Sequence, residues 1–352
     1  MNELHEVIAA LEGTAGARGA AVLATLVRVE GSAYSGPGAR MAVLPDASIA
    51  GTFGAGCFEQ DLVGHAERIR AAGAPALVRY DLTVDDDKPW GLGMGCHGKL
   101  DLLLEPVPPG QVPEHLAFLQ EAGRARQRAA VATLFGTGGD AALGLGHRLL
   151  VREHGETAGA LLGSKVGAAL LAEARAALAD GRARFFRAPG PQGDIEALIE
   201  VVAPPIALVV AGAGRDTVPL VRIGQELGWD VRTLGKDDLP QALDERCAAV
   251  VMSHNYERDV ALLAALLASP CRYVGVLGGQ VRVTRLLDEL KRHGTPVTPA
   301  QRARLHAPVG LDLGAETPSE VALSIAAEIQ AVFADRRGGA LSERKGPIHD
   351  RP

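Results

Sequence analysis

The spacing of apolar and polar positions predicts a mixed α/β fold for the first part of the chain. Short apolar runs predict strands at residues 20–29, 76–80, 100–104 and 129–134. Amphipathic spacing predicts helices at residues 3–11, 58–70 and 114–126. The apolar runs 41–44 and 48–50 flank Pro45 and Asp46, which indicates a hairpin. The pattern shows neither an internal repeat nor a low-complexity tract.

A different pattern begins after Pro204 and Pro205, which form the clearest linker in the chain. Residues 206–211 are continuously apolar, as in a strand that is buried on both faces. Further strands are predicted at residues 230–234, 248–252 and 272–277, each followed by a helical segment. This alternation predicts a Rossmann-like parallel sheet with helices on both faces.

A capping box locates one helix in the second part of the chain. Thr317-Pro318-Ser319-Glu320 combines an N-cap residue, a first-turn proline and a glutamate at the third helical position. We therefore expect a helix to start there and to continue through residues 321–333.

The first strand of this alternation runs into a partial dinucleotide-binding loop. Gly212 and Gly214 match the first two glycines of the fingerprint, which bring the backbone close to a phosphate at a helix N-terminus. Thr217 occupies the third glycine position, and Gly235 stands where an acidic residue would hold the ribose. The loop therefore predicts an anion or nucleotide site, or a Rossmann-type domain kept for its shape, rather than conventional NAD binding.

His254 directly follows the strand predicted at residues 248–252. In a parallel sheet the carboxyl end of a strand faces the binding crevice, so His254 could contact a ligand or transfer a proton there. It could equally be a surface histidine at the start of the next helix.

Composition and charge narrow the class of protein. The 352 residues carry a net charge of -6, with 47% hydrophobic and 22% charged residues. There is no basic block that would indicate nucleic-acid binding and no apolar run long enough to span a membrane. The N-terminus lacks the basic start and apolar centre of a signal peptide, so we expect a cytoplasmic protein with reduced thiols.

Two of the four cysteines are framed by glycines. Cys57 follows Gly54-Ala55-Gly56 where a loop becomes a helix, and Cys96 stands between Gly95 and His97. A thiol in the first turn of a helix has a lowered pKa, because the helix dipole favours the thiolate. The two residues could be small packing groups, nucleophilic or sulfur-carrying thiolates, or ligands of a soft metal. Cys247 and Cys271 lie beside apolar strands, and the simplest interpretation is that both are buried or half-buried small hydrophobic residues.

Several ordered motifs together resemble the XdhC/CoxI family, the maturation factors of molybdenum hydroxylases such as xanthine dehydrogenase. Outside residues 110–200 they span nearly the whole chain, and they read LVRVEGSAYSGPGARMAVLPDASIAGTFGAGCFEQD, GLGMGCHGKLDLLLEP, VVAGAGRDTVPLVRIGQELGWDV, VVMSHNYERDVALLAALL, RYVGVLGGQVRVTRLL, LHAPVGLDLGAETPSEVALSIAAEIQAV and GPIH. Two cysteine loops depart from the usual family pattern, since they read Gly-Ala-Gly-Cys and Gly-Cys-His-Gly here.

The resemblance implies an N-terminal domain that carries the cysteines and a Rossmann-like C-terminal domain. We expect the parts to be residues 1–109, a middle α/β segment 110–203, the Rossmann-like domain 204–337 and a polar tail 338–352.

The resemblance also implies a chaperone that binds and protects the molybdenum cofactor. It would help a cysteine desulfurase to sulfurate the cofactor and would deliver it to an apo molybdenum hydroxylase. Glycine amides and Arg40 would hold the molybdopterin phosphate, and a thiolate from Cys57 or Cys96 would lie near the molybdenum. A homodimer is expected because symmetric dimers are the commonest oligomers.

Two enzymatic alternatives remain open at this point. One is a nicotinamide-dependent oxidoreductase that uses the loop at residues 212–217, with His254 as acid and base. The other is a sulfurtransferase with a persulfide on Cys57.

Overall fold

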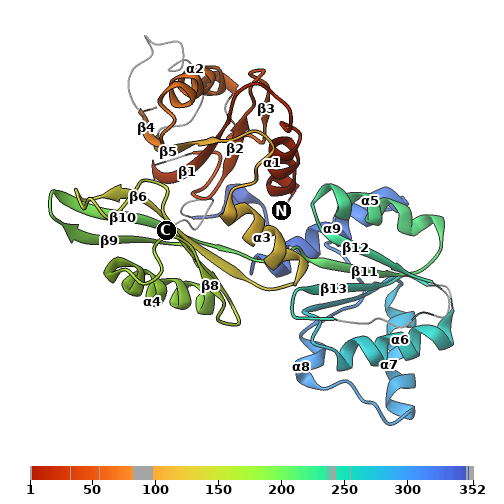
Figure 1. The fold of residues 1–352 in the computed structure, drawn as a ribbon. Helices are drawn as coiled ribbons and strands as arrows, with labels where there is room; N and C mark the ends of the chain where they lie inside the picture. Colours follow the sequence, from red (N-terminus) through yellow and green to blue (C-terminus); the bar gives the residue numbers. More distant parts are fainter. Residues whose placement is uncertain are drawn as a thin grey trace. The chain divides into compact units, whose positions relative to one another are not determined.

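A computed structural model describes residues 2–31, 33–54, 56–81, 98–235, 238, 243–253, 255–345 and 348, apart from the side chains of residues 2, 56–58 and 60. The chain folds into two compact units, residues 1–204 and 205–348 (Figure 1). The residues on either side of the boundary are Pro204 and Pro205. The segment 110–203 therefore lies in the same unit as the N-terminal residues.

The first unit contains two five-stranded antiparallel sheets. The first sheet has the strand order β3-β2-β1-β5-β4. Its strands are β1 (Ala21–Gly31), β2 (Arg40–Val43), β3 (Ile49–Ala50), β4 (Ala76–Asp81) and β5 (Gly98–Val107). The second sheet has the order β8-β7-β6-β10-β9. Its strands are β6 (Ala129–Thr137), β7 (Arg148–Arg152), β8 (Thr157–Ala158), β9 (Arg184–Gly190) and β10 (Gly193–Val202).

Helices cover both faces of each sheet in this unit. Helix α2 (Gly56–Ala72) packs on the outer face of the first sheet, and α4 (Lys165–Asp180) packs on the outer face of the second (Figure 1). The inner faces share one core with α1 (Asn2–Glu12) and α3 (Glu114–Arg124). Side chains along β1 point alternately to the two faces of the sheet, which explains this arrangement. Val22 and Ala24 face α2, while Ala21 and Leu23 face inward.

The two sheets repeat the same pairing in detail. Thr25 pairs with Arg40 in the first sheet, and Thr133 pairs with Arg148 in the second. Each sheet also has a register shift at the same place, directly after Leu26 in β1 and directly after Leu134 in β6. The expectation that the sequence contains no internal repeat is therefore wrong. A search for apolar periodicity over a few residues does not detect a repeat whose unit is a whole sheet with its helix.

Two reciprocal ion pairs join the sheets. Arg40 in the first sheet pairs with Glu200 in the second, and Arg148 in the second pairs with Glu105 in the first. Only 8% of the side chain of Arg40 and of Glu200 is exposed. The Nη1 atom of Arg148 donates to Oε1 of Glu105 at 2.8 Å. Because burial makes an unpaired charge expensive, each pair depends on the other sheet being in place.

A glycine beside each ion pair lets the partner carboxylate approach. A Cβ on Gly38 would lie 2.7 Å from Oε2 of Glu200, and one on Gly146 would lie 2.5 Å from Oε1 of Glu105. Both glycines also have a positive φ, 93° and 79°. A side chain at either position would therefore be strained and would displace the carboxylate.

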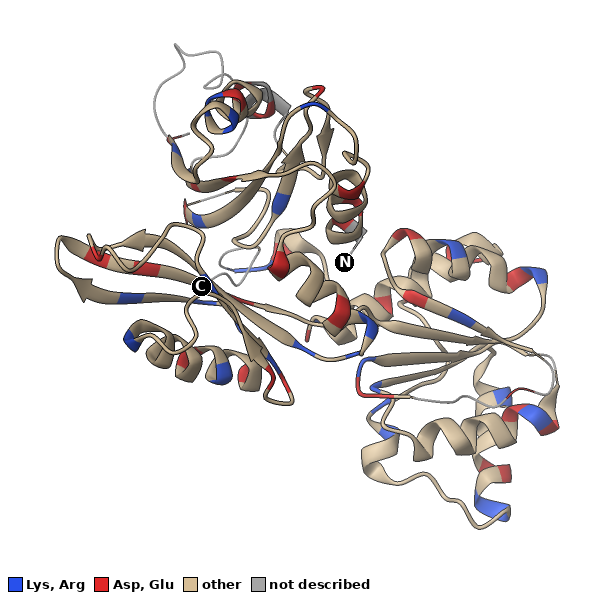
Figure 2. Cartoon of the chain, in the orientation of Figure 1, with Lys and Arg blue, Asp and Glu red and all other residues tan. Residues whose placement is uncertain are grey.

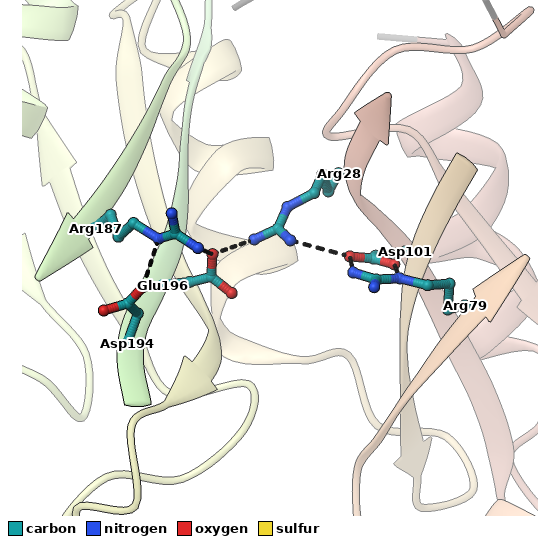
Figure 3. A network of polar contacts seen from close by, with 6 residues as sticks. All are labelled: Arg28, Arg79, Asp101, Arg187, Asp194 and Glu196. Carbon is teal, nitrogen blue, oxygen red and sulfur yellow. Dashed lines mark hydrogen bonds and ion pairs between the residues drawn. The ribbon is translucent and has the colours of Figure 1, made fainter. Parts of the chain in front are cut away.

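A second charge network crosses between the sheets at Arg28, as Figure 3 shows. Its guanidinium lies 3.5 Å from Oδ2 of Asp101 in the first sheet and 2.5 Å from Oε1 of Glu196 in the second. Each carboxylate is also paired within its own sheet, Asp101 with Arg79 at 2.6 Å and Glu196 with Arg187 at 3.4 Å. Arg28 thus stands between two matching arginine–carboxylate pairs.

The second unit contains a five-stranded parallel sheet with the order β12-β11-β13-β14-β15. Its strands are β11 (Ala207–Ala211), β12 (Asp230–Leu234), β13 (Cys247–Val251), β14 (Tyr273–Val276) and β15 (Leu305–His306). Helices α5 (Val218–Glu226) and α9 (Pro318–Phe333) pack on one face. Helices α6 (Tyr256–Ala268) and α7 (Gln280–Arg292) pack on the other, and the short helix α8 (Pro299–Arg302) follows.

The predicted Rossmann-like parallel sheet is therefore confirmed. The capping box is also confirmed, because Thr317 and Glu320 each accept a hydrogen bond from the other's backbone N–H at the start of α9. The strand order places β11 between β12 and β13, so the chain reverses direction across the sheet there. In such folds ligands bind at the carboxyl ends of the strands beside this point.

Acidic and basic residues are interspersed along the helices of both units, such as α4 and α7 (Figure 2). Among the residues that the structure describes, no helix combines the length and the apolar character needed to cross a bilayer.

The buried ion pair predicts a large and local stability effect. Glu200→Gln leaves the buried Arg40 without its counter-charge, so we expect a loss of about 3 kcal/mol in the free energy of unfolding. Glu153→Gln, which breaks the half-exposed pair with Arg128, should cost at most about 1 kcal/mol. Urea unfolding followed by circular dichroism measures both, and equal losses would contradict the role given to Glu200.

Burial of His115 predicts a pH dependence of the first unit. Burial, and then the charges of Arg148 and Arg40, hold the pKa of His115 well below its ordinary value of 6.5. The unfolded chain therefore binds a proton that the folded chain excludes, and stability falls as the pH drops below about 6.5. His115→Gln should flatten this part of the stability–pH profile, which urea unfolding at a series of pH values measures, and an unchanged slope would contradict the role given to His115.

Candidate functional site

The turn before α2 carries the first glycine-framed cysteine. It starts at Gly51, whose φ is 79° and where a Cβ would lie 2.7 Å from the carbonyl oxygen of Arg40. Thr52 Oγ1 accepts from the N–H of Gly54 at 2.9 Å and donates to Oε1 of Glu59 at 2.8 Å. Helix α2 begins at Gly56, so the backbone places Cys57 in its first turn, as predicted.

Tyr34 lies against this turn, and sequence reasoning alone does not identify it. Gly54 has a φ of 82°, and a Cβ built on it would lie 2.0 Å from Cδ1 of Tyr34. The glycine therefore makes room for the aromatic ring, which is 72% exposed. An aromatic residue inside the glycine- and proline-rich segment 31–38 is the signal that could have pointed to it, because the chain has only four tyrosines.

The structure gives the other predicted residues of this site different surroundings. Arg40 is buried and paired with Glu200, and it also donates to the carbonyl oxygen of Gly38 at 2.9 Å. A phosphate at Arg40 would have to compete with that carboxylate, so we assign Arg40 to the packing of the sheets. Gly95 and Cys96 lie outside the described residues.

The glycine loop of the second unit follows β11 closely. A Cβ on Gly212 would lie 2.9 Å from the carbonyl oxygen of Met252 and 3.1 Å from Cγ2 of Thr217, so the backbones approach each other tightly here. Thr217 is buried, and its hydroxyl donates to the carbonyl oxygen of Gly214 at 2.8 Å. Residues Arg215–Thr217 form a 3-10 turn before α5. Thr217 is thus accommodated by a tightened turn in place of the usual third glycine.

The end of β12 is the place where a Rossmann domain would bind a ribose. Here the backbone at this place is hydrogen-bonded by side chains of the protein itself. The N–H of Gly235 donates to Oδ2 of Asp238 at 2.8 Å, and Arg258 donates to the carbonyl oxygen of Gly235. These contacts fix the backbone at the position where the acidic residue is missing. Asp237, the other acidic residue nearby, lies outside the described residues.

A buried charge cluster supports the carboxyl end of β13. Asp259 in α6 is fully buried, accepts from the hydroxyl of Ser253 and pairs with Arg282 in α7. Arg282 also donates to the carbonyl oxygen of Ser253 at 2.8 Å. The cluster ties the segment after β13 to two helices, next to the loop at Gly212. His254 follows Ser253 directly but lies outside the described residues.

The remaining cysteines, Cys247 and Cys271, are both buried, in agreement with their expected packing role. A hydrogen bond with Cys247 lowers the pKa of the Cys271 thiol, although burial opposes the shift. In the described part of the chain no group of three or more His, Cys, Asp or Glu residues could hold a metal ion.

Comparison with known proteins assigns both units to one family. A family model described as "XdhC Rossmann domain" matches residues 208–329. A model described as "XdhC and CoxI family" matches residues 15–81 and residues 122–188. Together the two models cover parts of both compact units.

Individual proteins are similar over most of the chain. A Bacillus subtilis (strain 168) protein, named as a probable subunit of xanthine dehydrogenase, is 28% identical over 337 residues, which cover 88% of this chain and 92% of that protein. The uncharacterized protein YqeB of Escherichia coli (strain K12) is 28% identical over 233 residues, 57% of this chain and 43% of its own length.

A solved structure agrees with this relationship. A crystal structure from Bacillus halodurans, described as that of a xanthine dehydrogenase, is 26% identical and has a TM-score of 0.73, and it covers 94% of this chain and 97% of its own. The motifs, the Rossmann-like second unit and the matches in both units lead to one conclusion: the chain belongs to the XdhC and CoxI family.

Proposed function

We propose that this protein binds the molybdenum cofactor, protects it, supports its sulfuration and delivers it to a xanthine dehydrogenase-type molybdenum hydroxylase. Its family implies the coarser part of this role, an association with the maturation of xanthine dehydrogenase. Binding and transfer, rather than turnover, would be its activity.

The observation that carries the proposal is the turn at residues 51–57. It places Cys57 in the first turn of a helix, directly after a glycine segment on which an exposed tyrosine lies. The positive end of the helix dipole favours both a thiolate and an anionic ligand. Gly54, with a positive φ and no side chain, leaves the room in which the Tyr34 ring lies beside the turn.

These features match the chemistry of the cofactor as a cargo. A thiolate is a soft ligand, which suits a molybdenum centre better than it suits a hard cation. The pterin is a planar ring system, to which an exposed aromatic side chain such as Tyr34 offers a stacking face. The phosphate suits backbone N–H groups of a glycine turn. We propose Cys57 and Cys96 as contacts of the molybdenum, with the glycine turns at Gly54, Gly56 and Gly95 around them.

The second unit carries a separate candidate contact for an anion or a nucleotide. Gly212 and Gly214 lie at the carboxyl end of β11, beside the point where the strand order reverses. Thr217 and the closed position at Gly235 disfavour the ordinary NAD geometry. We therefore propose this loop as an anion or nucleotide contact, and we propose His254 as a further ligand contact.

The partners follow from the same role. We propose that the protein acts in the cytoplasm, accepts sulfur for the cofactor from a cysteine desulfurase and hands the cofactor to the apo hydroxylase. A homodimer is the proposed assembly.

Cofactor retention tests the thiolate contact. The protein is loaded with molybdenum cofactor released from a denatured hydroxylase, and bound molybdenum is followed by mass spectrometry during buffer exchange under nitrogen. Because a soft ligand is lost, Cys57→Ala combined with Cys96→Ala should lose the metal about tenfold faster, equivalent to about 1.4 kcal/mol. Cys247→Ala, at a buried thiol of the second unit, is the matched control and should behave as the unchanged protein.

The double variant could fold poorly, so its circular dichroism spectrum and urea midpoint are measured alongside. If the folded double variant retains molybdenum as well as the unchanged protein, the cysteines do not contact the metal.

The alternative, a nicotinamide-dependent oxidoreductase, predicts a different titration. With Thr217 and Gly235 in place, NADH and NADPH should not bind below about millimolar concentration. Nicotinamide fluorescence measures this directly, and micromolar binding that is lost in His254→Ala would favour the oxidoreductase.

A further inference from the structure

We infer that the first unit consists of two copies of one repeat, residues 2–107 and 114–202, and that only the first copy carries the ligand site. The first part of this inference stands on the structure of the unit alone. The second part rests on the proposed function, because it concerns where the cargo binds.

The two copies match in sequence as well as in topology. The same family model matches both stretches, and from β1 to β4 the residues of the first copy correspond to those from β6 to β9 without a gap. Identical residues stand at equivalent positions, in the pairs Ala24 and Ala132, Thr25 and Thr133, Leu26 and Leu134, Gly38 and Gly146, Arg40 and Arg148, Gly51 and Gly159, Leu62 and Leu170, Ala66 and Ala174, Gly73 and Gly181, and Arg79 and Arg187.

The shared residues have the same physical role in each copy. Gly51 and Gly159 both have a positive φ, and a Cβ on either would lie within 2.7 Å of a carbonyl oxygen, that of Arg40 or of Arg148. Leu62 in α2 and Leu170 in α4 are both fully buried against the outer face of their own sheet. The identities therefore record a common scaffold rather than chance.

The copies pack as the two halves of a symmetric dimer would. Arg40 of the first contacts Glu200 of the second, and Arg148 of the second contacts Glu105 of the first, which is the reciprocal pattern of an isologous interface. Their bulged residues Val27 and Phe135 lie in one shared apolar cluster. A single copy would expose this inner face to water, so each copy needs the other.

The copies diverge at the turn before the helix. Where the first copy has Tyr34 and Gly54, the second has Ala142 and an exposed Leu162. Where the first has Gly56 and Cys57, the second has Ser164 and Lys165. The Ser164 hydroxyl accepts from the N–H of Gly167 at 2.9 Å, so the second copy caps its helix with its own side chain.

The copies also diverge between their last two strands. In the second copy β9 ends at Gly190 and β10 begins at Gly193, whereas in the first copy residues 82–97 separate β4 from β5. Cys57 thus occurs where the first copy departs from the scaffold. The second copy serves as the structural partner, and each chain binds one ligand.

Matched variants test the assignment in the full-length protein. Using molybdenum cofactor as the probe, Tyr34→Ala and Cys57→Ala should each raise the rate of molybdenum loss at least about fivefold. The equivalent changes Leu162→Ala and Lys165→Ala should alter it less than about twofold. Saturation should occur at one molybdenum per chain. Two per chain, or equal losses from both sets, would overturn the single site while leaving cofactor binding intact.

A second measurement tests the repeat independently of any ligand. Because the two ion pairs are equivalent by symmetry, Glu105→Gln and Glu200→Gln should lower the urea midpoint of the first unit by the same amount. A shift in only one of them would overturn the equivalence of the copies. Failure of the unchanged protein to retain cofactor would instead refute the proposed function, and the single-site assignment with it.

Discussion

The first unit depends on burying the inner faces of its two sheets against each other. The reciprocal pairs Arg40–Glu200 and Arg148–Glu105 make this packing specific, since a buried charge without its partner costs several kcal/mol. Only one alignment of the sheets pairs all four charges at once. Glycines at positions 38 and 146 are required because no side chain fits beside the carboxylates. This contact sets how the two sheets lie against each other.

That packing explains how one scaffold can carry a site on one side only. The residues that hold the sheets together are common to both copies, so the turn at residues 51–57 and the segment 82–97 could change without affecting them. In the second unit, too, the residues that fix the backbone differ from those of the candidate binding loop. The Asp259–Arg282 cluster and the Asp238 contact to Gly235 fix the backbone around the strand-order reversal, and the loop at Gly212 remains at the carboxyl edge of the sheet.

Local patterns predict the elements well, whereas long-range contacts could not be predicted. The capping box at Thr317 and the helix start before Cys57 depend on neighbours within a few residues. By contrast, the sequence suggests a phosphate ligand at Arg40 because its partner Glu200 is far away along the chain. The repeat is hard to detect for a related reason, because the shared residues are scattered and become meaningful only once the strand registers align them. Tyr34 is identified only from the structure, because the feature that marks it is its position against Gly54, where a side chain would collide with the ring.

Hydrogen–deuterium exchange with and without the molybdenum cofactor tests the central claim most directly, because it locates the ligand on the unchanged protein. We predict that the cofactor slows exchange of backbone amides in residues 51–61 and leaves the equivalent residues 159–169 of the second copy unaffected. Slower exchange at both turns, or at residues 159–169 alone, would contradict the assignment of the site to the first copy.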